Sequence, residues 1–353
     1  QMCIRDRGSI CDVAEEVIDY LTAQGEKVGL IKVRLYRPWR ADKLLAAIPA
    51  TCKKIAVLDR TKEPGSQGEP LYMDVVTALA NAGRTDIQVI GGRYGLGSKD
   101  TPPASVFAVY DELKKDSMKR EFTIGIVDDV THHSLNVGEN ISTAGGSTIE
   151  CKFWGLGSDG TVGANKNSIK IIGDNTPQYV QAYFEYDSKK SGGVTKSHLR
   201  FGREPIRSAY YVTQADFVAC HKQSYIHSYD IVHEVKPGGT FLLNTLWKGE
   251  ELERNLPNHV KRTLARNHVK FYTIDAVSIA QELGLGNRTN TVLQAAFFKL
   301  SGVLPVDEAV QYMKDAITHS YFKKGDKVLN MNYAAVDRGL QSVEEIPVPD
   351  SWK

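Results

Sequence analysis

Short apolar runs alternate with amphipathic segments of helical periodicity along most of the chain. Strands that alternate with helices pair in parallel, and a parallel sheet is covered by helices on both faces. The pattern therefore predicts an α/β fold: two consecutive α/β domains with largely parallel sheets covered by helices. In the first half we expect helices over 10–21, 40–48, 70–82 and 103–117, and strands over 27–33, 54–59, 86–90 and 121–129.

The chain has 353 residues, which is too long for one ordinary domain and enough for two with separate cores. A stretch rich in Ser, Thr, Gly and Asn at 134–148 is typical of a linker, so we predict domains over 1–147 and 148–353. Residues 1–7 match no element, and we expect them to be a non-native leader. The proline-broken segment 346–353 resembles an interdomain linker cut short.

The apolar pattern resumes at Cys151 and continues to residue 341. A glycine-rich turn follows the first run of this half. The remaining elements are then expected as strands over 168–172, 194–199, 209–213, 216–220, 240–244 and 269–274, and helices over 175–184, 224–235, 249–266, 276–283, 289–301, 306–318 and 327–341.

The composition argues against several functional classes. A formal net charge of +2 gives no case for a nucleic-acid or membrane partner, and no apolar run reaches the roughly 20 residues that span a bilayer. The five cysteines are scattered without a C-x-x-C pair, which argues against disulfides and against a zinc or iron–sulfur site in this chain. We therefore expect a cytoplasmic protein.

The glycine-rich stretch 153–166 is the best candidate for a binding site. Gly155, Gly157 and Gly160 satisfy the G-x-G-x-x-G pattern before an expected helix start. Such a turn lets the backbone approach a phosphate, and the helix N-terminus offers free N–H groups and a partial positive charge. The same spacing also occurs simply where a strand turns into a helix.

The residues around this turn favour a phosphorylated ligand without selecting NAD. A dinucleotide fold needs an acidic residue about 20 positions further on. Asp174 lies only 14 positions after Gly160. Asp159 also places a carboxylate inside the turn, which disfavours a pyrophosphate lying directly on it. The hydroxyls of Ser158 and Thr161 are good phosphate donors.

No catalytic residue or metal site is predicted. The G-x-S-x-G and Walker patterns are absent, and for Cys220, which precedes His221, a small buried thiol is the favoured interpretation. The neighbours His132 and His133 would point to opposite faces of a strand, which disfavours a metal there. The loops 59–70 and 91–98 fit either a ligand or interface site or a solvated surface, and both interpretations stay open.

The stretch Phe153–Asn167 closely resembles the start of the gamma-type domain of the pyruvate:ferredoxin (flavodoxin) oxidoreductase family. The resemblance continues in 186–193, 198–202 and 296–300. Upstream, 29–38 and 57–65 resemble the second domain of the family, which is similar to the C-terminal domain of transketolase. The resemblance covers the chain from about residue 8 to its end.

The resemblance implies a fragment of an enzyme that decarboxylates pyruvate oxidatively to acetyl-CoA. Members use thiamine diphosphate with Mg²⁺ and [4Fe–4S] clusters, which would lie on domains absent here, and pass electrons to ferredoxin or flavodoxin. The fragment would carry domain II and the gamma-type, coenzyme A-binding domain III of a homodimer. It would be inactive alone, and a ferredoxin-like domain would follow Lys353.

The gamma-type domain is the coenzyme A site of the family, which implies a set of contact residues in this chain. Turn N–H groups and hydroxyls suit the CoA phosphates, a lysine pairs with their charge, and asparagines can bind the adenine edge or the pantetheine amides. The implied contacts are Ser158, Asp159, Gly160, Thr161, Val162, Lys190, Asn290 and Asn332. Two other classes remain as alternatives: a Rossmann-type NAD-dependent dehydrogenase and a non-catalytic oligomerisation module.

Overall fold

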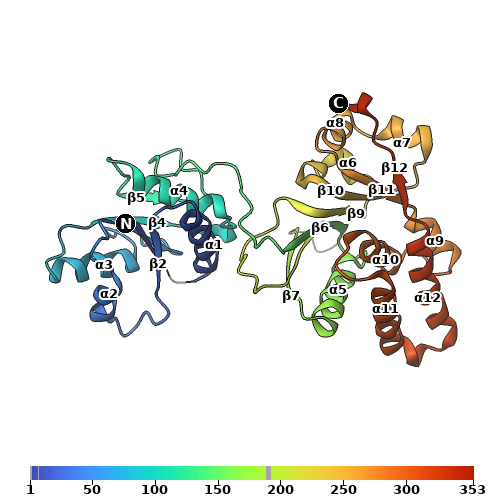
Figure 1. The fold of residues 1–353 in the computed structure, drawn as a ribbon, viewed down its shortest axis with the longest axis horizontal. Helices are drawn as coiled ribbons and strands as arrows, with labels where there is room; N and C mark the ends of the chain where they lie inside the picture. Colours follow the sequence, from blue (N-terminus) through green and yellow to red (C-terminus); the bar gives the residue numbers. More distant parts are fainter. Residues whose placement is uncertain (1, 7, 188–191) are drawn as a thin grey trace. The chain divides into compact units, whose positions relative to one another are not determined.

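The computed structural model describes residues 2–6, 8–187 and 192–353. The chain divides into two compact units (Figure 1), the first made of 1–144 with 207–211 and the second of 145–206 with 212–353. Each unit has one sheet with parallel strand pairs and helices on both faces, so the α/β fold class is confirmed. The boundary at 147/148 stays a prediction.

The first unit has a five-stranded, all-parallel sheet in the order β2-β1-β3-β4-β5. One face packs on α1 and α4, and the other on α2 and α3. The strands are β1 (Met2–Asp6), β2 (Val28–Lys32), β3 (Lys54–Asp59), β4 (Gln88–Arg93) and β5 (Glu121–Thr123), and the helices are α1 (Ile10–Ala23), α2 (Ala41–Ala47), α3 (Pro70–Asn81) and α4 (Pro103–Lys114).

The first residues of the chain form a strand, so the prediction that 1–7 match no element is wrong for Met2–Asp6. These residues pair in parallel with β2 on one side and β3 on the other, in the centre of the sheet. A central parallel strand normally consists of apolar residues, whereas Arg5 and Asp6 carry charges, and that is why the pattern missed it. The non-native origin of the segment stays a prediction.

The second unit has a seven-stranded mixed sheet in the order β12-β11-β10-β9-β6-β8-β7. The strands β11, β10, β9 and β6 are parallel, while β8 and β12 run antiparallel to their neighbours. The strands are β6 (Ile149–Leu156), β7 (Tyr179–Tyr186), β8 (Val194–Gly202), β9 (Ala215–Cys220), β10 (Val235–Asn244), β11 (Lys270–Ile274) and β12 (Glu344–Ile346).

Two cores lie on the two faces of this sheet. Figure 1 shows α5, α10, α11 and α12 on one side of the strands and α6, α7 and α8 on the other. The helices are α5 (Thr161–Asn175), α6 (Tyr225–Ser228), α7 (Gly249–Asn255), α8 (Asn258–Arg266), α9 (Ala276–Glu282), α10 (Asn290–Ser301), α11 (Val306–Tyr321) and α12 (Asp326–Gln341).

Several elements after the glycine turn differ from the sequence prediction. The run 168–172, expected as a strand, lies inside α5, and the expected helix 175–184 is largely the strand β7. Segment 209–213 is not a strand, since 207–211 returns to the first unit. The expected helix 249–266 is two helices separated at Leu256-Pro257, because proline lacks the N–H that a continuous helix requires.

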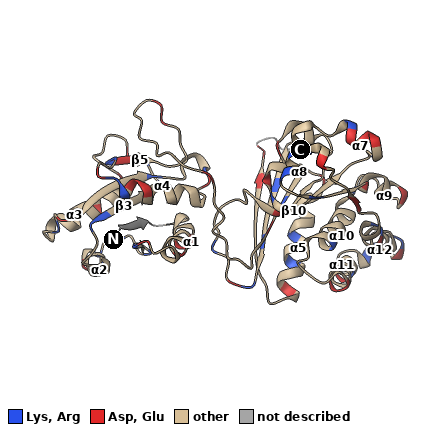
Figure 2. Cartoon of the chain, turned by 45° about the horizontal axis from the view of Figure 1, so that its top comes forward, with Lys and Arg blue, Asp and Glu red and all other residues tan. Residues whose placement is uncertain are grey.

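Charged residues of both signs are interspersed over the helices (Figure 2), as in α7, which carries Glu250, Glu251 and Arg254. Among the described residues, no helix combines the length and the apolar character needed to cross a membrane.

Candidate phosphate-binding site

The candidate site lies where the strand order of the second unit reverses. From β6 the chain passes through α5 to β7 and β8 on one side of β6, and then places β9 on the other side. The parallel strands β6 and β9 therefore end side by side, with the turn 157–160 after β6 and His221 after β9. The His221 N–H donates to the Trp154 carbonyl at 2.8 Å, which joins the two ends. Ligands of α/β sheets bind at such a reversal.

The turn after β6 is organised by the side chain of Asp159. Its carboxylate accepts from the N–H of Leu156 at 2.8 Å, the N–H of Thr161 at 2.7 Å and the Thr161 hydroxyl at 2.9 Å. Ser158 and Gly160 have φ values of +75° and +91°, so the backbone turns sharply at both positions. The expected conflict between this carboxylate and a phosphate is thereby reduced, because three donors inside the turn already hold the carboxylate.

Gly155 lets the first residue of α5 lie directly on the sheet. A Cβ at position 155 would lie 2.6–2.9 Å from three side-chain atoms of Thr161, which is 2% exposed. The first glycine of the pattern therefore makes room for Thr161 and brings the start of α5 against the end of β6.

The Thr161 hydroxyl also joins the helix to the end of β9. Thr161 Oγ1 lies 2.8 Å from Nδ1 of His221, whose carbonyl accepts from Asn244 Nδ2 at 3.0 Å. Desolvation lowers the pKa of the half-buried His221 to about 4, although the Asp159 charge opposes this shift. His221 is therefore neutral at physiological pH.

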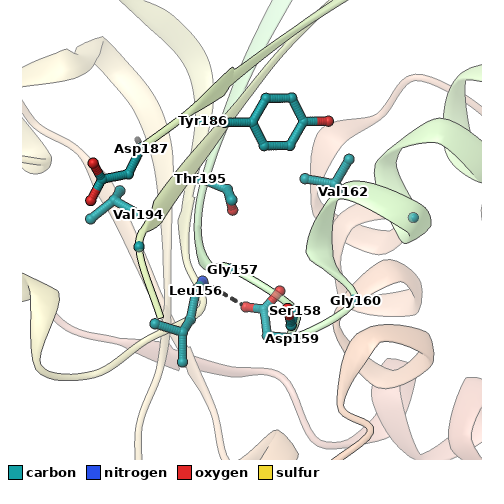
Figure 3. A pocket seen from close by; sticks show the side chains of 12 residues that line it. Leu156, Gly157, Ser158, Asp159, Gly160, Val162, Tyr186, Asp187, Val194 and Thr195 are labelled. Carbon is teal, nitrogen blue, oxygen red and sulfur yellow. Dashed lines mark hydrogen bonds between the residues drawn. The ribbon is translucent and has the colours of Figure 1, made fainter. Parts of the chain in front are cut away.

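A pocket of about 410 Å³ opens beside this turn (Figure 3). Its walls come from the turn, from the first turn of α5 and from the ends of β7 and β8. The lining residues are Leu156, Gly157, Ser158, Asp159, Gly160, Val162, Gly163, Tyr186, Asp187, Gly193, Val194 and Thr195.

Four backbone N–H groups bordering the pocket have no acceptor within the described part of the chain. They belong to Ser158, Gly160, Val162 and Gly163, whereas the N–H of Gly157 and Asp159 donate to the carbonyls of Gly193 and Leu156. Unpaired N–H groups at the start of a 15-residue helix combine with the helix dipole to form a site suited to an anion.

The structure brings together most of the sequence-predicted contact residues. Ser158, Asp159, Gly160 and Val162 line the pocket, and Thr161 starts the adjoining helix. Asn290, at the start of α10, lies against Gly160: a Cβ on that glycine would be 3.3 Å from the Asn290 Cβ. Asn332 is not among the lining residues, and its side-chain amide donates to the Val328 carbonyl at 2.8 Å. Lys190 lies outside the described residues. All eight contacts stay predictions.

Sequence reasoning missed the β7–β8 wall and His221. Tyr186, Val194 and Thr195 line the pocket because β8 pairs with β6. The segment 194–199 was expected to be a strand, yet nothing local indicated that it neighbours β6. His221 was set aside together with Cys220, which is indeed buried: desolvation raises the pKa of its thiol to about 12, and Sγ donates to the Lys222 carbonyl at 3.2 Å.

The loops 59–70 and 91–98 of the first unit, whose role was left open, contact each other. Arg93 forms an ion pair with Glu69, and Arg60 Nε donates to the Gly95 carbonyl at 3.2 Å. The loops 59–70 and 91–98 thus hold each other, and a ligand role for them stays a prediction. Within the described ranges, no group of three or more His, Cys, Asp or Glu is placed to hold a metal.

The fold and the site define an α/β protein with a glycine-rich turn and a helix N-terminus at the reversal point of its sheet, an arrangement suited to phosphorylated ligands. Residues 150–342 match the model of the pyruvate ferredoxin/flavodoxin oxidoreductase family, and residues 2–106 match pyruvate:ferredoxin oxidoreductase core domain II. The chain belongs to the pyruvate ferredoxin/flavodoxin oxidoreductase family. The second match begins at residue 2, further toward the N-terminus than sequence reasoning placed the resemblance.

Relatives in the family are much longer than this chain. It is 61% identical to the pyruvate:ferredoxin oxidoreductase of Moorella thermoacetica over 98% of this chain and 29% of that protein. It is 52% identical to the pyruvate-flavodoxin oxidoreductase of Enterobacter agglomerans over 98% of this chain and 30% of that protein. The pyruvate oxidoreductase subunit PORC of Thermotoga maritima gives a TM-score of 0.46 at 22% identity, over 56% of this chain and 98% of that one. The chain thus spans about three tenths of the length of the curated relatives it matches.

Proposed function

We propose that the second unit binds coenzyme A as part of a 2-oxo acid oxidoreductase that converts pyruvate to acetyl-CoA and passes electrons to ferredoxin or flavodoxin. The observation that carries this proposal is the set of four N–H groups, in the glycine turn and the first turn of α5, that find no acceptor among the described residues and border one pocket. These groups and the Ser158 hydroxyl can donate to phosphate oxygens.

The pocket combines polar and apolar walls, as a CoA site requires. The turn and the start of α5 form the polar wall, while Leu156, Val162 and Val194 contribute apolar side chains. The polar wall suits the phosphates, and the apolar wall suits a pantetheine arm, which carries only two amides along its length. Asn290 lies against Gly160 and offers an amide at the rim of the turn.

The described residues position coenzyme A and supply no reacting group. His221 is neutral and engaged by Thr161, the thiol of Cys220 is buried, and Asp159 is held by three donors. The 2-oxo acid chemistry then belongs to thiamine diphosphate with Mg²⁺, and the electron transfer to iron–sulfur clusters, on domains outside this chain. We further propose a cytoplasmic homodimer, with 1–147 as the transketolase-like domain II and 148–353 as the gamma-type domain III.

Calorimetric titration of the 353-residue chain with CoA, and separately with NAD, tests the proposal. Binding of CoA without oxidoreductase activity is the expected result. Tighter binding of NAD than of CoA would replace the proposal with the Rossmann-type dehydrogenase. Absence of binding to either nucleotide would favour the oligomerisation module.

A further inference from the structure

Thr195 carries a buried hydroxyl that forms no hydrogen bond with the described residues. Thr195 lies near the start of β8, is 6% exposed, and lines the 410 Å³ pocket. Its Oγ1 finds no hydrogen-bond partner among the residues that the structure describes. Figure 3 shows this hydroxyl directed into the space between Tyr186, Val162 and the glycine turn. A buried polar group without a partner destabilises the free protein, so its presence requires an explanation.

The strand register places this hydroxyl close to the start of α5. Thr195 is the direct partner of Gly155 in the antiparallel pair β6–β8, and the space above Gly155 is filled by Thr161, the first residue of α5. The Thr195 side chain therefore stands beside the first turn of the helix, where the N–H groups of Val162 and Gly163 are unpaired among the described residues.

Thr195 is the buried hydroxyl of the site that forms no hydrogen bond with the described residues, and the other two hydroxyls differ from it. The Thr161 hydroxyl is engaged by Asp159 and His221, and Ser158 is exposed. A buried donor that faces a helix N-terminus across a partly apolar pocket bonds most strongly to an anionic acceptor, because the low local dielectric strengthens a charge-assisted hydrogen bond.

We propose that Thr195 Oγ1 donates a hydrogen bond to a phosphoryl oxygen of the ligand held by the first turn of α5. This inference rests on the proposed function only for the identity of that ligand. It adds to the site a contact residue from β8, which lies outside the glycine-rich sequence pattern.

Three variants of the chain isolate this hydroxyl. Thr195→Val keeps the shape of the side chain and removes the donor, while Thr195→Ser keeps the donor. Ser197→Ala is the matched control, because the Ser197 hydroxyl lies two residues further along β8, is also buried and lacks a partner within the described ranges, and does not line the pocket.

We expect Thr195→Val to unfold at the same or a higher temperature than the parent chain, because a methyl group replaces an unpaired hydroxyl. Its calorimetric affinity for CoA should nevertheless fall about tenfold or more, the effect of losing a hydrogen bond to a charged group. Thr195→Ser should stay within about threefold of the parent, and Ser197→Ala should leave the affinity unchanged. Unchanged CoA affinity in Thr195→Val would overturn the inference.

Inorganic pyrophosphate separates the inference from the proposed function. The probe is added to ¹⁵N-labelled chain, and amide shifts of the turn 157–163 are followed in the parent and in Thr195→Val. A weaker response in the variant supports the phosphoryl contact even if CoA itself does not bind. A parent chain whose turn amides do not respond, or a variant that responds equally, overturns it.

Discussion

The hydroxyl of Thr161 and the imidazole of His221 lie 2.8 Å apart, although 60 residues separate them in the chain. The Thr161 hydroxyl has one hydrogen, which it donates to Asp159 at 2.9 Å, so it accepts from the Nδ1–H of His221. These two hydrogen bonds connect the end of β9, the first residue of α5 and the carboxylate that organises the glycine turn. His221 is accordingly a positioning residue for the pocket, although it does not line it.

Replacing His221 by leucine removes the N–H that donates to the Thr161 hydroxyl, and the glycine turn is then held less firmly. We expect the affinity for CoA to fall about tenfold and the free energy of unfolding to fall by about 1 kcal/mol. His221→Asn can offer a side-chain N–H in a similar place and should retain most of the affinity. Titration calorimetry measures both, with the exposed His259→Gln as control. Equal affinities for the leucine variant and the parent would show that the hydrogen bond between His221 and Thr161 does not support the site.

Gly155→Ala should lower both the stability and the CoA affinity. The added Cβ would lie 2.6–2.9 Å from atoms of Thr161, which is packed between the helix and the sheet and has little room to move. Overpacking of this kind costs about 1–3 kcal/mol, measurable by urea unfolding.

The matched control for Gly155→Ala is Gly146→Ala, in the same unit. A Cβ at position 146 meets nothing within 4 Å, and its φ is not positive. If both variants unfold at the same urea concentration, the close contact between position 155 and Thr161 is not the reason that a glycine is needed there.

The glycine turn was predictable from the sequence because the glycines that define it are close together in the chain. The pattern of Gly155, Gly157 and Gly160 located the turn and the helix start, and α5 begins at Thr161. The prediction nevertheless ended this helix too early. Ile169, Ile171 and Ile172 indicate a strand by composition, but Ile171 and Ile172 pack into the core from α5, where tertiary burial outweighs β propensity.

The rest of the site depends on strand order, which no local pattern encodes. Thr195 lines the pocket and His221 contacts Thr161 because β8 and β9 both pair with β6, from opposite sides. The strand β1 was missed because of its local composition. It pairs regularly with β2 and β3, but Arg5 and Asp6 do not match the apolar composition of a central strand.

Removing Glu234 should destabilise the chain more than removing its partner Lys152. Lys152 Nζ lies 2.6 Å from one oxygen of Glu234, and Trp154 Nε1 donates to the other at 2.7 Å. Desolvation lowers the pKa of Lys152, whose side chain is 7% exposed. Glu234→Ala leaves a buried ammonium and an indole N–H unpaired and should cost about 3 kcal/mol.

Lys152→Met is the comparison for this pair, since it replaces the buried charge by an apolar chain of similar length and should cost about 1 kcal/mol or less. Urea unfolding of both variants at pH 7 provides the measurement. A larger loss in Lys152→Met than in Glu234→Ala would mean that the attraction between the two charges exceeds the cost of burying the lysine.

The stability of the chain should fall as the pH decreases from about 6.5 toward 4. Burial lowers the pKa of both His198 and His221 to about 4, with the neighbouring charges of Lys152 and Arg200 adding to the shift at His198 and Glu185 opposing it. The unfolded chain, with histidine pKa values near 6.5, therefore binds more protons than the folded chain in this window, and the free energy of unfolding rises with pH.

By pH 5 the loss should reach about 2 kcal/mol for His198 and somewhat less for the half-buried His221. Urea unfolding at pH 7, 6 and 5 measures it, because most carboxylates are still ionised at pH 5 in both states. Glu185, whose pKa is lowered to about 2 chiefly by His198, keeps its charge throughout this window. Since His221→Gln removes one titrating group, it should reduce the slope by roughly half; an undiminished slope would exclude His221 as a source of the acid sensitivity.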